Sequence, residues 1–424
     1  MAHFIIHGGK RLRGRHKPPG NKNAALPMLA ACVLTDQPLR LRNVPLIQDV
    51  RTMLDILAEL GVHITVRGRT VCLCAKTIHS TSLDKALCGK VRSSILFAGP
   101  LAARHGSATL FPPGGDVIGR RRLDAHFEGL RQLGIHQSGS DSYRFQRRRL
   151  KGTRILLDEA SVTATENVVM AACLAPGKTS VFNAACEPHV QDLCRMLNKM
   201  GAAITGIGTN CLTIRGVRRL KGADHRVAPD YIDTAGFIAA AALTGGSLTV
   251  QDAPRSHLDV IQRGFLKLGL KWRFRDRLLV LPGNQSLRIT TDFGSAVPKI
   301  EDGTWPAFPS DLMSAAIVLA TQAEGTVLFF EKLFESRMYF VDRLIDMGAR
   351  IVQCDPHRVL VTGPAALHGS HMSSPDIRAG MALLLAALCA KGCSRISNAE
   401  IIDRGYENVD LELRELGADI ERVE

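Results

Sequence analysis

The segment from Pro113 to Arg122 combines residue types that bind anions. It reads Pro-Gly-Gly-Asp-Val-Ile-Gly-Arg-Arg-Arg, and so joins three glycines, the carboxylate of Asp116 and three consecutive arginines. Glycines allow close backbone approach to a ligand and let a loop move, while arginines recognise phosphate and carboxylate groups through paired hydrogen bonds. A surface loop with solvated charge is the alternative. The apolar, glycine-rich surroundings of Asp116 favour an anion-binding loop.

Further charged side chains stand at the starts of otherwise apolar helical segments. One such residue alone would be read as a helix cap, but a helix N-terminus that carries a cation is also a ready anion site. Corresponding positions in several segments indicate one shared site where helix starts converge. Arginines at the starts of two outer helical segments suggest further anion clamps, with solvent-facing charges of a first helical turn as the alternative. The residues concerned are Lys22 with Asn23, Arg92, Asp311 and Arg378 in the apolar segments, and Arg337 and Arg404 in the outer ones.

Other possible motifs carry little weight. Gly177-Lys178-Thr179 resembles the end of a phosphate-binding loop, but Ala172 stands where its first glycine must be. The chain has no dinucleotide-binding glycine fingerprint, no Cys-x-x-Cys pair and no His-Glu-x-x-His sequence. We therefore expect neither a cofactor nor a metal. His126 follows the arginine-rich loop and could contact a ligand, although a lone histidine is more often structural.

These residues lie on a repeated unit. Six amphipathic segments each end in Leu-Gly or Met-Gly followed by an apolar strand pattern, at intervals of 67 to 79 residues. Each glycine stands where a helix stops and the chain must adopt a left-handed conformation to enter a strand. The six glycines are Gly61, Gly134, Gly201, Gly269, Gly348 and Gly417.

The other half of each unit is a helix rich in alanine and leucine. Such helices are apolar on nearly all sides and should be buried, whereas the amphipathic helices, such as 50–60, should lie outside. We expect the buried helices at 23–34, 91–103, 165–174, 233–243, 311–320 and 376–390. With the strands between them, they predict an α/β protein made of six helix–strand units.

Three units per lobe is the natural division of this chain. The expected boundary lies at Ala228-Pro229-Asp230, where a proline separates two units. The first strand, 4–6, has no helix before it and could close the second lobe. We therefore expect one lobe at 22–228, with a mobile loop at about 112–122, and a second lobe at 1–21 and 229–424. The anionic ligands should bind in a cleft between the two.

Bulk composition narrows the function. The 424 residues carry a formal net charge of +14, which fits small polyanionic substrates. Nucleic-acid binding is disfavoured because aromatic residues make up only 5% and the arginines do not gather in one tail. No apolar run is long enough to span a bilayer, and the N-terminus has no signal-peptide pattern. Eleven scattered cysteines read as reduced core thiols of a cytoplasmic protein.

The same residues resemble those of a known family. The matching segments, in chain order, are Lys22-Asn-Ala-Ala-Leu-Pro, Val91-Arg-Ser-Ser-Ile, the Pro-Gly-Gly-x-x-Ile-Gly-x-Arg loop, Phe308-Pro-Ser-Asp, Glu335-Ser-Arg, Asp376-Ile-Arg and Asp403-Arg-Gly-Tyr-Glu. Together they are similar to the UDP-N-acetylglucosamine 1-carboxyvinyltransferases, which are enolpyruvyl transferases. The resemblance covers essentially the whole chain. It implies a two-lobed inside-out α/β barrel that closes around its substrates.

The resemblance also implies an activity and a set of site residues. The substrates would be phosphoenolpyruvate and UDP-N-acetylglucosamine, and the enzyme would be a cytoplasmic monomer. By position, phosphoenolpyruvate would be bound by Lys22, Arg92, Arg121, Arg378 and Arg404. The catalytic residues would be Asp116, Asp311 and Lys22, with Asp311 contacting the attacking hydroxyl as general base or orienter. Asn23, Arg92, Asp124, His126, Ser161, Asp311, Leu333 and Glu335 would line or stabilise the UDP-sugar side.

Several positions depart from the family pattern. Many members have cysteine where this chain has Asp116, so we expect resistance to the thiol-alkylating epoxide fosfomycin. Gln48 stands where a lysine is usual, Glu159 replaces a lysine that some members have, and Thr163 and Tyr231 also differ. These departures leave two alternatives open. One is a related enolpyruvyl transferase with another nucleotide or nucleotide-sugar acceptor, and the other is a ligand-binding protein without turnover.

Overall fold

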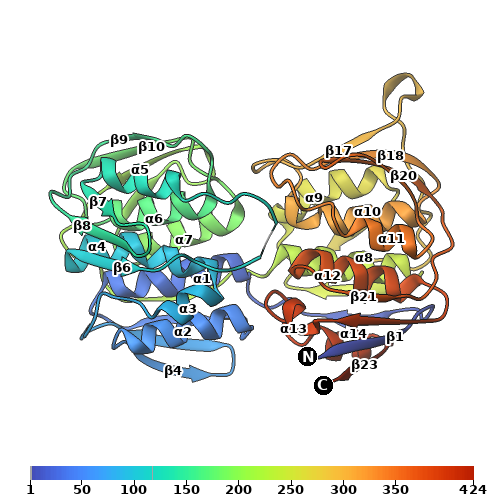
Figure 1. Cartoon of the computed structure of the whole chain (residues 1–424), viewed down its shortest axis with the longest axis horizontal. Coiled ribbons are helices and arrows are strands. Elements are labelled where there is room, and N and C mark those ends of the chain that lie inside the picture. Colours follow the sequence, from blue (N-terminus) through green and yellow to red (C-terminus); the bar gives the residue numbers. More distant parts are fainter. Residues whose placement is uncertain (1, 117) are drawn as a thin grey trace. The chain divides into compact units, whose positions relative to one another are not determined.

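The computed structural model describes residues 2–116 and 118–424, which fall into two compact units. Unit 1 comprises Met1–Pro19, Val117–Arg120 and Pro229–Glu424, and unit 2 comprises Gly20–Asp116 and Arg121–Ala228. In Figure 1 each unit consists of helices flanked by strands. Each is described separately below.

Unit 2 is built around three apolar helices. These are α1 (Lys22–Ala31), α4 (Ala98–His105) and α6 (Val162–Ala172), which are buried along most of their length. The amphipathic helices α2 (Gln48–Glu59), α5 (Asp124–Gln132) and α7 (Pro188–Lys199) each leave one polar face exposed. The short helices are α3 (Lys85–Lys90), η1 (Cys32–Leu34) and η2 (Arg92–Phe97).

Three sheets surround these helices, in the orders β13-β3-β5-β4, β6-β8-β7 and β11-β12-β10-β9. The first sheet closes the unit, because β13 pairs in parallel with β3 from the other end of the unit, with His225 opposite Leu41. The strands are β3 (Leu39–Arg42), β4 (His63–Arg67), β5 (Thr70–Cys74), β6 (Ser107–Leu110), β7 (Ile135–Ser138), β8 (Tyr143–Arg147), β9 (Arg154–Leu156), β10 (Lys178–Phe182), β11 (Ala203–Thr205), β12 (Cys211–Arg215) and β13 (Ala223–Arg226).

Unit 1 repeats this plan. Its buried helices are α8 (Tyr231–Leu243), α10 (Met313–Gln322) and α12 (Ile377–Cys389), which pack against one another. The outer helices are α9 (Arg255–Lys267), α11 (Val341–Asp346), α13 (Ala399–Ile402) and α14 (Val409–Glu415), and the short turns are η3 (Phe293–Ser295) and η4 (Ser310–Leu312).

The unit 1 sheets have the orders β21-β22-β1-β23, β15-β16-β14-β2 and β17-β18-β20-β19. The N-terminal strand β1 lies between β22 and β23, so the two ends of the chain share one sheet (Figure 1). The strands are β1 (His3–His7), β2 (Arg13–His16), β14 (Ser247–Gln251), β15 (Arg273–Arg275), β16 (Leu278–Leu281), β17 (Lys299–Glu301), β18 (Gly325–Phe330), β19 (Arg350–Asp355), β20 (Arg358–Gly363), β21 (His371–Ser373), β22 (Cys393–Ser397) and β23 (Asp419–Val423).

The glycine repeat is confirmed. All six repeat glycines have φ between +83° and +103°, in the left-handed region, and each follows an outer helix. The buried helices also lie where the sequence predicts them, with ends that differ by a few residues. One difference is that the second and fifth begin with a 3₁₀ turn, η2 and η4, before the α-helix starts.

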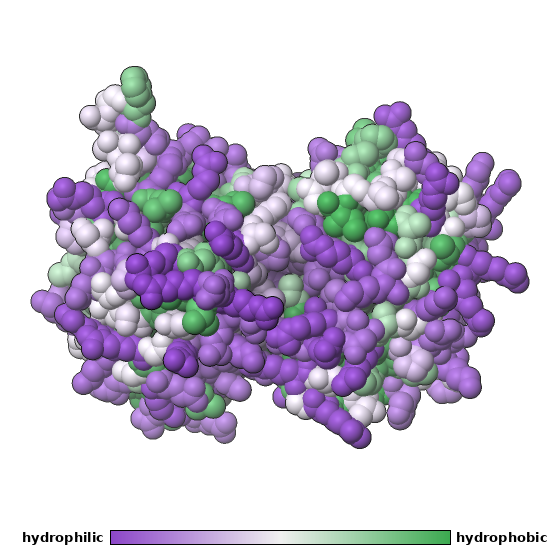
Figure 2. All heavy atoms as spheres, turned by 180° about the vertical axis from the view of Figure 1, so that it is seen from behind, coloured by the Kyte–Doolittle hydropathy of each residue, from purple (hydrophilic) through white to green (hydrophobic). Residues whose placement is uncertain are grey.

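The prediction that the cysteines are core thiols is only partly right. Cys354 and Cys393 are exposed because they point outward on strands β19 and β22. Among residues 2–116 and 118–424, none of the helices combines the length and apolar character needed to cross a membrane. The face seen in Figure 2 is mostly hydrophilic, with small separate apolar areas.

Candidate active site

Lys22 is held by a buried ion pair. It is the first residue of α1, whose cap is Asn21: the Asn21 side chain accepts the backbone N–H of Ala24 at 3.0 Å. The Lys22 Nζ atom lies 2.7 Å from Asp49 Oδ2, and both side chains are less than 10% exposed. A buried charge pair of this kind fixes the ammonium group in position. Asp49 was not among the predicted site residues, because its only signal in the sequence is an acidic residue in the first turn of an outer helix.

Arg92 supports the second half of the arginine-rich loop. Its guanidinium donates to the backbone carbonyls of Arg121 at 2.9 Å and Arg122 at 3.2 Å. Gly115, with φ of +111°, packs so closely that a Cβ there would lie 3.0 Å from the Arg92 Cβ. Asp116 follows this glycine and is half-buried. The loop therefore needs glycine beside Arg92, and Arg92, Arg121 and Asp116 belong to one neighbourhood.

The next part of the loop, residues 118–120, belongs to unit 1 and is bonded within that unit. The Ile118 carbonyl accepts the backbone N–H of Ser336 at 3.3 Å, and the Arg120 backbone N–H donates to Glu335 Oε2 at 2.9 Å. Gly119, with φ of +125°, is in the left-handed region and is crowded, since a Cβ there would lie 3.0 Å from the same Glu335 oxygen. Val117 lies outside the described residues. Glu335 thus holds the loop backbone in this structure.

His126 is enclosed by protein groups. It is 1% exposed, and burial together with Arg92 lowers its pKa to about 3, so the ring is neutral. The Asn167 amide nitrogen lies 3.1 Å from His126 Nδ1, and the Asn167 oxygen already accepts the Gly99 N–H at 2.7 Å. Because an amide nitrogen only donates, Nδ1 must accept and Nε2 must carry the proton. Nε2 then donates to the Thr163 hydroxyl at 3.0 Å.

That arrangement orients Thr163 at the start of α6. Its oxygen accepts from His126, which leaves its own O–H available to donate on the half-exposed side of the residue. Ser161 caps the same helix, with its Oγ accepting the Ala164 N–H at 3.5 Å. The first turn of α6 therefore presents the Thr163 hydroxyl at the N-terminus of a helix, which suits an anion.

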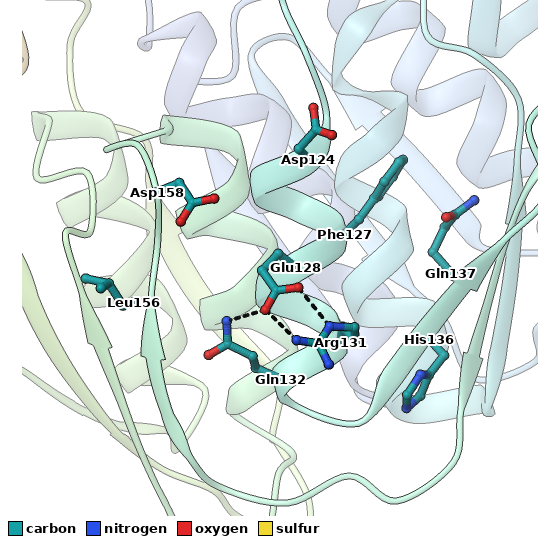
Figure 3. A pocket seen from close by; sticks show the side chains of 9 residues that line it. All are labelled: Asp124, Phe127, Glu128, Arg131, Gln132, His136, Gln137, Leu156 and Asp158. Atoms are coloured by element: carbon teal, nitrogen blue, oxygen red, sulfur yellow. Dashed lines mark hydrogen bonds and ion pairs between the residues drawn. The ribbon is translucent and has the colours of Figure 1, made fainter.

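A pocket of about 550 Å³ lies beside these residues in unit 2. Figure 3 shows its wall: α5 supplies one side, with the Glu128 carboxylate bonded to Arg131 at 2.7 Å and to Gln132 at 2.8 Å. Its lining mixes carboxylates, amides, one arginine and one histidine with two apolar side chains. The lining residues are Asp124, Phe127, Glu128, Arg131, Gln132, His136, Gln137, Leu156 and Asp158. The Asp124 side chain is also paired with the Arg122 guanidinium.

In unit 1, Asp311 is clamped by two arginines. Arg337 lies 2.8 Å from its Oδ1 and Arg378 lies 2.9 Å from its Oδ2. Burial alone would raise the pKa of Asp311, but the two guanidinium groups hold it well below its usual range. Asp311 is therefore ionised and weakly basic. Arg337 was expected only as an anion clamp, and its pairing with Asp311 was missed.

Arg378 is also buried, at 7% exposure, and its guanidinium lies 5.4 Å from the centre of the Tyr406 ring. The α12 cap, Asp376, accepts the backbone N–H of Arg378 at 2.8 Å. Arg404 follows α13 and is half-buried, while Leu333 is 44% exposed in the segment before Glu335.

The structure thus joins some predicted residues and leaves others apart. It connects Arg92 with Arg121, Arg378 with Asp311, and Glu335 with the loop, whereas Asn23 and Ser161 show only helix-start positions. Within residues 2–116 and 118–424 no group of three or more His, Cys, Asp or Glu side chains could hold a metal ion.

The six-unit fold with arginine-rich helix starts is that of an enolpyruvyl transferase. The family model of EPSP synthase (3-phosphoshikimate 1-carboxyvinyltransferase) matches residues 6–413, and the chain belongs to this family. Among solved structures, the enolpyruvyl transferase NikO from Streptomyces tendae matches with a TM-score of 0.88 at 23% identity, over 100% of this chain and 99% of that one. EPSP synthase from Acinetobacter baumannii matches with a TM-score of 0.77 at 18% identity, over 100% of both chains.

Sequence relatives define the branch of the family. The chain is 50% identical to the UDP-N-acetylglucosamine 1-carboxyvinyltransferase of Treponema denticola, over 100% of both chains. It is 52% identical to the enzyme of that name from Bradyrhizobium diazoefficiens, over 99% of this chain and 98% of the relative. The chain is therefore an enzyme of the UDP-N-acetylglucosamine 1-carboxyvinyltransferase branch of the enolpyruvyl transferases.

Proposed function

We propose that this chain transfers the enolpyruvyl group of phosphoenolpyruvate to the 3′-hydroxyl of UDP-N-acetylglucosamine and releases phosphate. This reaction would be the first committed step of peptidoglycan precursor synthesis, carried out in the cytoplasm by a monomer. The observation that carries the proposal is the 50% identity to a curated transferase of this specificity over the whole of both chains.

Phosphoenolpyruvate carries a carboxylate and a phosphate, so it needs several cations. We assign this role to Lys22, Arg92, Arg121, Arg378 and Arg404. Support comes from Lys22, Arg92 and Arg378, which are each held in place by protein partners. Preorganised cations of this kind lose little side-chain freedom on binding. A bound phosphate would compete with Asp311 for Arg378.

The acceptor needs groups that bind its nucleoside, its diphosphate and its sugar. In unit 2 the nucleoside would occupy the pocket beside Asp124, whose carboxylates and amides suit a uracil and ribose hydroxyls but repel a diphosphate. The diphosphate would bind at Arg92 and at the first turn of α6, which Ser161 begins and where His126 orients Thr163. Asn23, Leu333 and Glu335 would contact or stabilise the sugar side.

The reaction is an addition followed by an elimination. In the addition, the acceptor oxygen bonds to C2 of phosphoenolpyruvate, C3 gains a proton and becomes a methyl group, and the hydroxyl proton passes to the phosphate group, which carries it away in the elimination. In the elimination, C3 loses a proton, the double bond reforms and the C2–oxygen bond to phosphate breaks. Asp116, on the loop, is the candidate acid for C3. Asp311 orients the acceptor hydroxyl, and its two arginine partners make it a poor proton acceptor in this state.

The activity is tested by following phosphate release from phosphoenolpyruvate with UDP-N-acetylglucosamine, then with other nucleotides and nucleotide sugars. Turnover with the first acceptor supports the proposal. Turnover only with a different acceptor would identify the chain as a related transferase, and tight binding of both substrates without phosphate release would identify a ligand-binding protein.

The Asp311 assignment has its own test. Asp311→Asn keeps the shape but removes the charge that both arginines bind, so kcat should fall at least 100-fold, while phosphoenolpyruvate binding should be retained because Arg378 becomes available. Isothermal titration and steady-state kinetics measure the two effects. Wild-type kcat in this variant would contradict the assignment.

A further inference from the structure

Two carboxyl groups are buried side by side in unit 1, directly behind the segment that carries Asp311. Strands β17 and β18 are parallel, with Glu301 opposite Phe330, and each strand is followed by an acidic residue. These are Asp302 and Glu331, and both are 0% exposed. Because the two strands are parallel and end in register, the two residues that follow them are neighbours. Their carboxyl groups are within hydrogen-bonding distance of each other.

Their hydrogen bonds can be complete only if the pair holds a proton. Asp302 Oδ1 accepts the backbone N–H of Lys332, but no donor among the described residues reaches its buried Oδ2. The Ser310 hydroxyl lies 2.8 and 3.0 Å from the two Glu331 oxygens. A protonated Glu331 supplies the missing donor to Asp302. Two carboxylates in contact cannot both ionise readily in such a site, and burial together with Asp302 raises the pKa of Glu331 to about 9.

The surrounding charged groups do not replace that proton. Arg337 favours the ionised form of Glu331, but its guanidinium bonds to Asp311 instead. Lys332 directs its ammonium to Glu301, at 3.5 Å. His357 uses Nδ1 on the backbone carbonyl of Glu331, at 2.7 Å, and does not bond to the carboxyl group. The proton shared with Asp302 is therefore the remaining way to neutralise the pair.

This pair is connected to the reacting end of the site through one residue. Ser310 opens η4 and is followed by Asp311, so its hydroxyl ties the start of that turn to Glu331. We propose that Glu331 is a positioning residue: its neutral carboxyl group, bonded to Asp302, holds Ser310 and thereby sets Asp311 between Arg337 and Arg378. The assignment rests on the proposed function, because it gives Asp311 the task of orienting the acceptor.

The test compares pH profiles of kcat. Glu331→Gln keeps a donor for Asp302 and an acceptor for Ser310 but cannot lose a proton. We expect kcat within about twofold of wild type at pH 7. In wild type kcat should fall as pH rises past about 9, and in this variant that fall should be absent. Glu331→Leu, which offers neither hydrogen bond, should lower kcat at least tenfold with the KM for phosphoenolpyruvate unchanged. Glu324→Gln, at an exposed surface ion pair of the same unit, is the matched control.

Two results would overturn the proposal: an unchanged alkaline fall in Glu331→Gln, or wild-type kcat in a folded Glu331→Leu. If Glu331→Leu does not fold, the pH profile of kcat in Glu331→Gln still tests the proposal. Wild-type protein without turnover would count against the proposed function instead. In that case the carbon-13 signal of the Glu331 carboxyl group, assigned with Glu331→Gln, still reports the proton directly. An ionised Glu331 at pH 7 would disprove the shared proton.

Discussion

At the scale of single residues, the site is made of charged groups whose partners are already in place. Lys22 is paired with Asp49, Asp311 with two arginines, and Arg92 with backbone carbonyls of the loop. Truncating one member of such a pair leaves the other charge buried and unpaired, which costs more than the pair contributes. Substitutions that keep shape and hydrogen bonds are therefore the informative ones.

Asp116 leads to a prediction about covalent inhibition. A carboxylate is a poor target for an epoxide that alkylates thiols, so incubation with fosfomycin should leave the mass of the protein unchanged and its activity intact. Asp116→Cys places a thiol at the same half-buried position and should gain one fosfomycin adduct. Mass spectrometry of the loop peptide measures both. An adduct on Asp116 itself would show the prediction to be wrong.

Thr163 leads to a prediction about acceptor binding. Its hydroxyl accepts from His126 and so is turned to donate outward. Thr163→Val removes that donor at nearly constant volume and should raise the KM for the acceptor about tenfold, the cost of one hydrogen bond to a charged group, with the KM for phosphoenolpyruvate unchanged. Thr163→Ser keeps the hydroxyl and should keep the wild-type KM for the acceptor. Thr213→Val, on a strand of the same unit, is the control. Equal increases in both KM values would indicate a structural role.

At the scale of elements, the chain depends on where each helix ends. The repeat glycines all adopt left-handed backbone, but the space around them differs. Position 201 is open, whereas a Cβ at position 134 would lie 2.0 Å from the Arg149 carbonyl oxygen. The same sequence signal therefore covers two physical situations, backbone strain alone and strain plus a steric clash.

This difference predicts unequal effects of alanine. Gly201→Ala should cost about 1–2 kcal/mol, the left-handed penalty of an ordinary residue. Gly134→Ala should cost more, because the neighbouring backbone must also move. Urea unfolding of the full-length variants compares the two losses of stability, since both positions lie in unit 2. Equal losses would mean that the Arg149 carbonyl yields without cost.

At the scale of the whole molecule, segments far apart in sequence complete each unit. β13 closes the sheet that begins with β3, and β1 lies between β22 and β23. In unit 1, β2 pairs with β14 and ends at His16, whose two ring nitrogens lie 2.6 Å from Asp233 and 3.0 Å from Glu412. The ring also stacks on Phe237, with centroids 4.0 Å apart.

His16 makes stability depend on pH. Burial opposes its charged form, but Asp233 and Glu412 raise its pKa to about 9. Because the pKa of His16 is higher in the folded protein than in the unfolded chain, protonated His16 stabilises the fold. This contribution is complete below the unfolded-chain pKa of about 6.5 and is lost as pH rises through the folded-state pKa of about 9. The melting temperature should therefore decline between pH 7 and pH 10 from this source. His16→Gln should be less stable than wild type at pH 7, and the difference should shrink by pH 10. His63→Gln, at an exposed position, should show no such trend.

The sequence by itself determined the repeat, the buried helices, the left-handed glycines and the residue types of the site. These follow from local rules, because helix periodicity and helix termination depend on neighbours a few residues away. Only the tertiary structure decided how the site residues are paired and protonated. Asp49 beside Lys22, Arg378 on Asp311, Asn167 behind His126 and the proton shared by Asp302 and Glu331 all join separate segments. Hydrogen bonding and pKa depend on which groups meet and how deeply they are buried, and no local pattern encodes that.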